Sequence, residues 1–311
     1  MSIRYLFKPH APVDVSTICT AVDGSRDFES FLTSYERNQI DCEWGKLVRK
    51  HEGKVFSKPR ALGTLYDTSR NTLTFLPTDF KTYVSIARRS VDDVHARLND
   101  VYNQMRVGAV GAAVRFNDGV YAVHRRPSTA THVPNMIDSS VAGLAFVNDE
   151  NGQLRFSPLE DIVYSKLARE LNLTKEQVSK PLLTGVHNST ELDYSGMFSF
   201  HMDANVPSSE LERLANPAWM SDCYRVAEKD LPDFIIEHYA MTKDMSGDGA
   251  AVMLSALAPQ RFLDTVKRIH GHTSHRPIHF GQLVDGSFKE KKLPWAYDGE
   301  FAPLLSSPEL I

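Results

Sequence analysis

Residues 158–173 read PLEDIVYSKLARELNL, and this stretch decides the fold. Its apolar residues recur at the spacing of a helix with one buried face; they are Leu159, Ile162, Val163, Leu167 and Leu171. Pro158 stands where helices commonly begin, and Glu160 and Asp161 put negative charge in the first turn, where the helix dipole favours it. The pattern predicts a helix over residues 158–173.

Alternating strand-like and helical patterns surround this helix. Strands are predicted at residues 107–115 and 120–124, joined by the turn 116–119, and again at 139–147, 182–187 and 196–202. Further helices are predicted at residues 231–241 and 249–257. This order favours helices packed against a mixed sheet, the arrangement of an α/β sandwich.

The first part of the chain has its own pattern of elements. We expect a helix at residues 27–38, a hairpin between residues 63 and 75, and a connecting helix at 91–105. These elements form a smaller α+β module. The predicted domain bounds are therefore 1–105 for this module, 106–258 for the sandwich, and 259–311 for an extension that packs on the core.

Composition excludes several classes of protein. The net charge of −4 and a pI near 6.3 give no electrostatic reason to expect nucleic acid or an anionic membrane as a partner. The three cysteines fit neither a disulfide framework nor a metal knuckle, which favours a reducing compartment. No signal peptide and no apolar run of about 18 residues occurs. We expect a cytoplasmic protein.

The segment from about residue 107 to 239 resembles a Nudix domain. That family's helix follows the pattern E-x7-R-E-U-x-E-E-x-G-U, where U is a bulky aliphatic residue. Residues 170–173 (ELNL) match its closing E-x-G-U, Leu167 takes the aliphatic position, and residues 138–143 (DSSVAG) occupy the place of the family's glycine turn. The resemblance implies an α/β/α sandwich with a mixed sheet, and hydrolysis of a diphosphate with a divalent metal ion.

The departures from the family pattern bear on that chemistry. Lys166 and Arg169 stand at two positions where the family has metal-binding glutamates, and Ser165 stands at that of its arginine; Glu170 alone is retained. Positions 166, 169 and 170 share one helix face, so two cations there would repel Mg²⁺, which prefers carboxylate oxygens. We expect no ordinary metal cluster and no cofactor; a Mg²⁺ ion is the less favoured alternative.

Three interpretations of Lys166 and Arg169 stay open. They could replace the charge of the metal and neutralise an anionic substrate directly. The fold could have been kept while the diphosphate chemistry was lost. Both side chains could also be solvated, each paired with a neighbouring carboxylate on the helix surface.

Other candidates lie outside this helix. Arg125 and Arg126, at the end of a predicted strand, are candidates for anion binding. His132 and Glu191, in predicted loops, are candidates for acid/base roles. Asp248 is expected to cap the following helix.

The last part of the chain holds a group of histidines that could serve a zinc ion, a weak signal that we do not favour; they are His270, His272, His275 and His279. The segment from residue 280 onward is expected to wrap a domain or to form a homodimer contact.

These observations predict an enzyme that acts on a small phosphorylated or otherwise anionic metabolite, with diphosphate hydrolysis as the leading reaction. The site would use Glu170, His132 and Glu191 for catalysis and bind substrate through four cations: Arg125, Arg126, Lys166 and Arg169. The alternatives are a metal-independent lyase or isomerase on the same fold, and a non-catalytic binding or regulatory protein.

Overall fold

The computed structural model describes residues 3–8, 11–15, 19–22, 29, 32–50, 59–67, 72–79, 81–82, 106–130, 133–144, 147–150, 153–156, 158–189, 195–272, 276–284 and 287–290. The helices are α1 (Ser34–Lys50), α5 (Leu159–Leu171), α6 (Leu211–Leu214), α7 (Leu231–Ile235), α8 (Gly247–Ser255) and α9 (Pro259–His272); a π-helix, η6 (Ile236–Met241), continues α7. Two 3-10 turns are η3 (Lys175–Gln177) and η5 (Ser208–Glu210).

The strands are β1 (Ile3–Phe7), β2 (Val13–Asp14), β3 (Cys19–Val22), β4 (Pro59–Asp67), β5 (Thr72–Asp79), β6 (Arg106–Phe116), β7 (Val120–Arg125), β8 (Ile137–Asp138), β9 (Val141–Leu144), β10 (Val147–Glu150), β11 (Gln153–Phe156), β12 (Leu182–Ser189), β13 (Ser195–Ala204), β14 (Asp222–Ala227), β15 (Ile278–Val284) and β16 (Ser287–Glu290).

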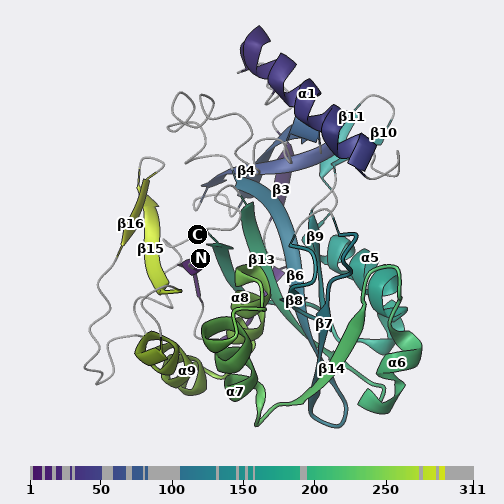
Figure 1. Ribbon diagram of the computed structural model, residues 1–311, viewed down its shortest axis with the longest axis vertical. Helices are drawn as coiled ribbons and strands as arrows, with labels where there is room; N and C mark the ends of the chain where they lie inside the picture. The colour runs from purple at the N-terminus through teal and green to yellow at the C-terminus, as the bar shows by residue number, and fades with distance from the viewer. Residues whose placement is uncertain are drawn as a thin grey trace.

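A mixed sheet with β6 near its centre organises the described residues. The main path runs β16-β15-β1-β12-β13-β6-β4-β5-β3, and β9 and β7 also pair with β6. Strand β13 runs parallel to β6, from Ser195↔Val107 to Ala204↔Phe116, whereas β9 runs antiparallel to it. Figure 1 shows α5 and α6 on one side of these strands and α7, α8 and α9 on the other. The predicted α/β/α sandwich with a mixed sheet is confirmed.

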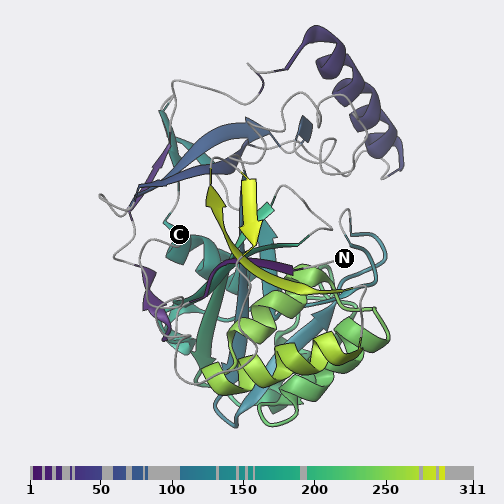
Figure 2. The same ribbon diagram turned by 90° about the vertical axis from the view of Figure 1, so that its left-hand side faces the viewer.

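Strand β6 separates two hydrophobic cores. Because side chains alternate along a strand, Val110 and Val114 pack with Leu167 and Leu171 of α5. The next residues in the alternation, Ala109 and Ala113, pack instead with the side chains of α7, α8 and α9. The sheet is therefore covered on both faces, and Figure 2 shows the helices of the α7–α9 side in front of it.

Helix α5 forms where the sequence predicts it. Pro158 is its N-cap, and the chain leaves the helix at Asn172, whose φ of 48° lies in the left-handed region. The backbone N–H of Asn172 donates to the carbonyl of Leu167, which closes the last turn. Asparagine tolerates this conformation better than most side chains, so it replaces the glycine of the family pattern without loss of the turn.

The N-terminal predictions have mixed outcomes. The hairpin is confirmed, with β4 and β5 antiparallel and Gly63 opposite Phe75. The helix predicted at 27–38 is wrong in its bounds, because a capping box starts α1 later: Thr33 N donates to Glu36 Oε2 (2.6 Å), and Glu36 N donates to Thr33 Oγ1 (3.2 Å). The helix predicted at 91–105 lies outside the described residues. Strand β4 pairs with β6 at Leu62↔Val107, so the first strands continue the central sheet.

The single strand predicted at 139–147 is wrong in its bounds: β9 forms only at Val141–Leu144, after β8, and β10 begins at Val147. Ser140, between β8 and β9, explains the interruption. Its hydroxyl donates to the carbonyl of Ala122 on β7 (2.5 Å) and accepts from the backbone N–H of Val114 on β6 (2.8 Å). The chain is thereby held across two neighbouring strands rather than extended along one.

The last part of the described chain contains more regular structure than predicted. The histidine segment includes the end of α9, and β15 pairs in parallel with β1. The backbone N–H of Ile278 donates to His270 Nε2 (3.0 Å), so this ring joins α9 to β15. Residues 291–311 lie outside the described residues, and the homodimer contact stays a prediction. No helix among the residues described is long and apolar enough to cross a membrane.

Leu167→Ala should lower the free energy of unfolding by about 2–5 kcal/mol, because Leu167 is fully buried between α5 and the sheet. Ser165→Ala, at an exposed position of the same helix, should change it by less than about 0.5 kcal/mol. Urea unfolding of the two variants tests this. Equal losses would contradict the assignment of the two helix faces.

Candidate functional site

Lys166 and Glu170 lie at the seam between α5 and β9. Both are buried, with 2% and 3% of their surfaces exposed. Glu170 Oε2 accepts a hydrogen bond from the backbone N–H of Ala142 (3.2 Å). The ammonium of Lys166 lies against Gly143, where a Cβ atom would be 2.5 Å from Nζ. The interpretation of Lys166 as a solvated surface cation is therefore wrong, because the side chain is buried. Its ammonium fits inside the seam because Gly143 has no side chain.

Arg169 lies at the edge of the same seam. Its guanidinium forms an ion pair with Glu170, and its Cζ atom lies 4.1 Å from the centroid of the Trp219 ring. Asn216 fixes this arrangement, since its side-chain amide donates to the carbonyl of Arg169 and its backbone N–H donates to that of Glu170 (both 2.9 Å). Sequence reasoning missed Trp219, because no local pattern shows that its loop folds back onto α5.

A third cation, Arg126, follows the last residue of β7 and pairs with a buried carboxylate. Arg126 Nη1 lies 3.0 Å from Oδ2 of Asp138, whose side chain is buried. The other oxygen of Asp138 accepts from the backbone N–H of Ser139 (2.8 Å) and from the hydroxyl of Ser246 (3.4 Å). Asp138 thus holds Arg126 and also contacts the residue that caps α8.

Arg125 points to the opposite face, because successive side chains of a strand alternate. Its guanidinium donates to Asp244 Oδ2 (2.8 Å) and to the hydroxyl of Tyr224 (3.1 Å). The structure therefore does not bring Arg125 together with Lys166 and Arg169, although the sequence placed all of them in one site.

His124 adds an uncharged imidazole beside these charges. It is buried, and desolvation lowers its pKa below the ordinary value, while Asp138 and Glu170 oppose that shift. Its Nδ1 atom has no hydrogen-bond partner among the described residues. The sequence singled out its neighbours Arg125 and Arg126 for anion binding but gave no reason to assign an acid/base role to this histidine.

The charged groups form two sets. Lys166 and Arg169 lie at the seam with the carboxylate of Glu170, and Arg126 pairs with Asp138. Both carboxylates are engaged by guanidinium groups. Over the ranges that the structure describes, no group of three His, Cys, Asp or Glu side chains could hold a metal ion. These residues do not fit the carboxylate cluster that Mg²⁺ requires.

Two of the predicted acid/base residues, His132 and Glu191, lie outside the described residues. Asp248 does not cap α8, because Ser246 does so by accepting a hydrogen bond from the backbone N–H of Gly249 (2.8 Å). Asp248 instead faces His187, with 3.5 Å between Oδ1 and Nε2, on the α8 side of the sheet. Both side chains are buried, and the pair lies on the other face of the sheet from the seam.

Comparison with known proteins gives similarity at the level of fold. No protein-family model matches the sequence, and no curated protein matches it. The protein DR0079 from Deinococcus radiodurans is 24% identical over 48% of this chain and 81% of its own, with a TM-score of 0.36. A MutT protein from Methanosarcina mazei is 14% identical over 50% of this chain and 92% of its own (TM-score 0.34). A Nudix hydrolase from M. smegmatis is 17% identical over 53% of this chain and 88% of its own (TM-score 0.30).

The two covered faces of the sheet, helix α5 and the turn at β9 that meets it agree with the α/β/α sandwich that the resemblance implies. The TM-scores below 0.5 and identities below 25% assign neither a substrate nor a reaction to this chain.

His124→Gln should reduce the loss of stability in acid. The folded protein keeps His124 neutral, whereas the unfolded chain binds a proton as the pH falls below about 6.5. Below that pH the unfolded state therefore binds more protons than the folded state. The contribution of neutral His124 to the free energy of unfolding is present above that pH and is lost below it, with a slope of up to about 1.4 kcal/mol per pH unit.

Urea unfolding at several pH values between 7 and 5 measures this slope. The wild-type free energy of unfolding should fall more steeply with decreasing pH than that of the variant. Burial also lowers the pKa of His201, so part of the wild-type slope should persist in His124→Gln. Identical slopes would contradict the account of His124.

Proposed function

We propose that this protein binds a phosphorylated small molecule at the α5–β9 seam and hydrolyses its diphosphate, with ammonium and guanidinium groups in place of a carboxylate-bound metal ion. The observation that carries the proposal is the placement of Lys166, a buried cation held against Gly143 at a position where the family has a metal-binding glutamate. A cation at a site shielded from water stabilises phosphate charge more strongly than one on the surface.

The neighbouring groups support separate parts of this role. Arg169 and Arg126 offer guanidinium groups, which match the geometry of phosphate oxygens. Each is held by a buried carboxylate, Glu170 or Asp138, so its position is set before a ligand arrives. Such preorganisation reduces the entropy that binding costs.

The proton transfer that hydrolysis needs is assigned to His124. A neutral imidazole can accept a proton from water, and burial favours the neutral form of this side chain. Its Nδ1 atom makes no hydrogen bond to a described residue. Glu170 is a weaker candidate for the base, since its carboxylate already accepts from Ala142 and pairs with Arg169.

A second candidate function is binding without turnover. The observation that favours it is that both carboxylates, Glu170 and Asp138, are ion-paired, which leaves neither of them poised to activate water. A protein of this kind would recognise the same anionic ligand and would not consume it.

Lys166→Met should weaken the binding of inorganic pyrophosphate roughly tenfold or more, because it removes a desolvated charge from the site. Lys175→Met is the matched control: Lys175 lies beyond the end of α5, its side chain is 60% exposed, and its loss should leave binding unchanged. Titration calorimetry in the presence and absence of EDTA measures both. Binding that EDTA abolishes, or equal affinities in the two variants, would overturn the proposed site.

Turnover separates the two candidate functions. Wild-type protein should release phosphate or a monophosphate from a panel of nucleoside and prenyl diphosphates, with or without EDTA, and His124→Gln should lower the rate by about a hundredfold. Pyrophosphate binding with no product from any substrate would instead favour the binding protein.

A further inference from the structure

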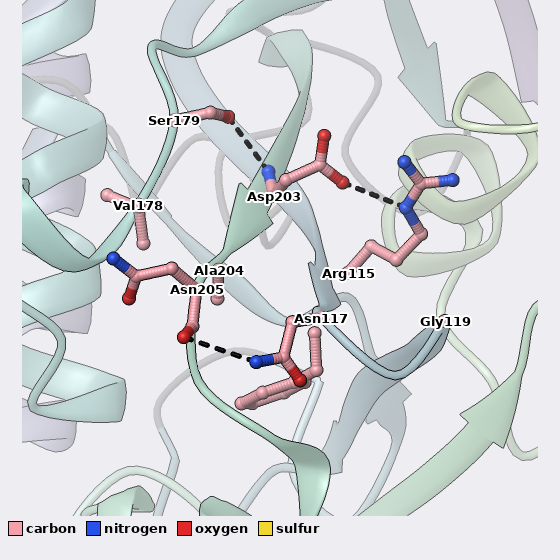
Figure 3. A pocket seen from close by; sticks show the side chains of 9 residues that line it. Arg115, Asn117, Gly119, Val178, Ser179, Asp203, Ala204 and Asn205 are labelled. Atoms are coloured by element: carbon pink, nitrogen blue, oxygen red, sulfur yellow. Dashed lines mark hydrogen bonds and ion pairs between the residues drawn. The ribbon is translucent and has the colours of Figure 1, made fainter.

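The charges of the pocket at the carboxyl ends of β6 and β13 are paired with one another. Figure 3 shows Arg115 beside Asp203; Arg115 Nε donates to Asp203 Oδ1 (2.8 Å), and Arg115 Nη1 donates to Glu228 Oε2 (3.1 Å). Lys8, which follows β1, is different. It is buried, with 7% of its surface exposed, and it forms no ion pair with any residue that the structure describes. Its charge therefore lacks a counterion.

A register shift in β1 accompanies the inward direction of this lysine. Ile3 and Tyr5, two residues apart, both pack in the core on the α7–α9 side of the sheet. Between Tyr5 and Phe7 the pairing of β1 with β12 shifts by one residue. Such a shift changes which residues of a strand face a given side. An even-numbered residue, Lys8, consequently faces the same helices as Ile3 and Tyr5.

The surroundings of the Lys8 amine are uncharged. Its Nζ atom donates to the carbonyl of Ser255, the last residue of α8 (3.1 Å), and lies 5.2 Å from the centroid of the Phe262 ring on α9. Beside it, Ser255 Oγ donates to the hydroxyl of Tyr5 (3.3 Å), which donates to the carbonyl of Ala251 (2.8 Å). The amine thus has one hydrogen-bond acceptor and an aromatic face within the part of the chain that the structure describes.

Burial favours the neutral form of this amine. Desolvation lowers the pKa of Lys8 to about 8. At pH 7 about one tenth of the Lys8 side chains are therefore neutral, against less than about one in a thousand for a lysine with the ordinary pKa. The neutral amine has the lone pair that attack on a carbonyl carbon requires, and the ammonium form lacks it.

We propose that Lys8 is a modification site that takes a small acyl group from an acyl phosphate. The amine nitrogen attacks the carbonyl carbon; a C–N bond forms, the C–O bond to phosphate breaks, phosphate leaves, and the nitrogen loses one proton to water.

The uncharged product explains the choice of an acyl donor. The amide keeps one N–H to donate to the carbonyl of Ser255, and it removes an ammonium that is buried without a counterion. An aldehyde would give an imine, whose protonated form keeps the charge. Lys8 packs against α8 and α9, on the other face of the sheet from Lys166, so the inference does not rest on the proposed function.

Incubation of the native full chain with acetyl phosphate tests this site, with acetylation of each lysine followed by mass spectrometry of proteolytic peptides. Two exposed lysines of the same molecule are the comparators: Lys175, whose side chain is 60% exposed, and Lys267 on α9. At pH 7 Lys8 should be acetylated at least about tenfold faster than either, because burial raises its neutral fraction. Acetylation of Lys8 at the same rate as the comparators, or more slowly, would overturn the proposal.

Two controls connect the reactivity to the fold. In the native protein the acetylation rate of Lys8 should level off above about pH 8, whereas in concentrated urea it should keep rising toward about pH 10, the ordinary range of lysine. The advantage over Lys175 should disappear in urea, because unfolding exposes the amine. An advantage that persists in urea, or the same pH profile in both states, would refute the proposal. Lys8→Arg, whose guanidinium stays charged, should lose acetylation at this position and leave the rate at Lys175 unchanged.

Discussion

The burial of Glu170 and Lys166 between α5 and β9 is the constraint on which the rest of the site depends. An isolated charge inside a protein is costly, so each buried group needs a partner or a fitted space. Glu170 meets this need through the backbone of Ala142 and the guanidinium of Arg169, and Lys166 fits because residue 143 is glycine. These contacts fix the position of α5 relative to β9.

The same constraint explains how a Nudix-like helix can carry cations. In the family pattern this face holds carboxylates that share a metal ion, and here the charges are inverted at two positions while the fold is kept. The carboxylates of Glu170 and Asp138 position the guanidinium groups of Arg169 and Arg126. Under the proposed function, these side chains would bind phosphate without a mediating ion, because their positions are fixed by the core.

Local sequence patterns predicted the helices and strands whose formation depends on residues close together in the chain. The spacing of apolar residues identified α5, and strand-like runs separated by turns or polar segments identified β6, β12 and β13. The sequence did not reveal which side chains meet, because that depends on strand pairing over long separations. Arg125 and Arg126 are adjacent in the chain, yet the alternation of β7 separates them.

Residues from distant segments were the hardest to anticipate. Trp219 stacks on Arg169, and Asp138 orients Arg126. No sequence motif predicts the turns that bring these residues together. The family's helix pattern did predict Glu170, Lys166 and Arg169 on one face, and the structure places them together at the seam. The positions of single residues followed from sequence only where the helical period fixed the geometry.

The most direct measurement is a crystal structure of the protein with inorganic pyrophosphate and MnCl₂, with data collected for the anomalous signal of manganese. The account predicts pyrophosphate oxygens within hydrogen-bond distance of Lys166 Nζ and no anomalous peak at Glu170. A manganese ion bound to the Glu170 carboxylate would contradict it.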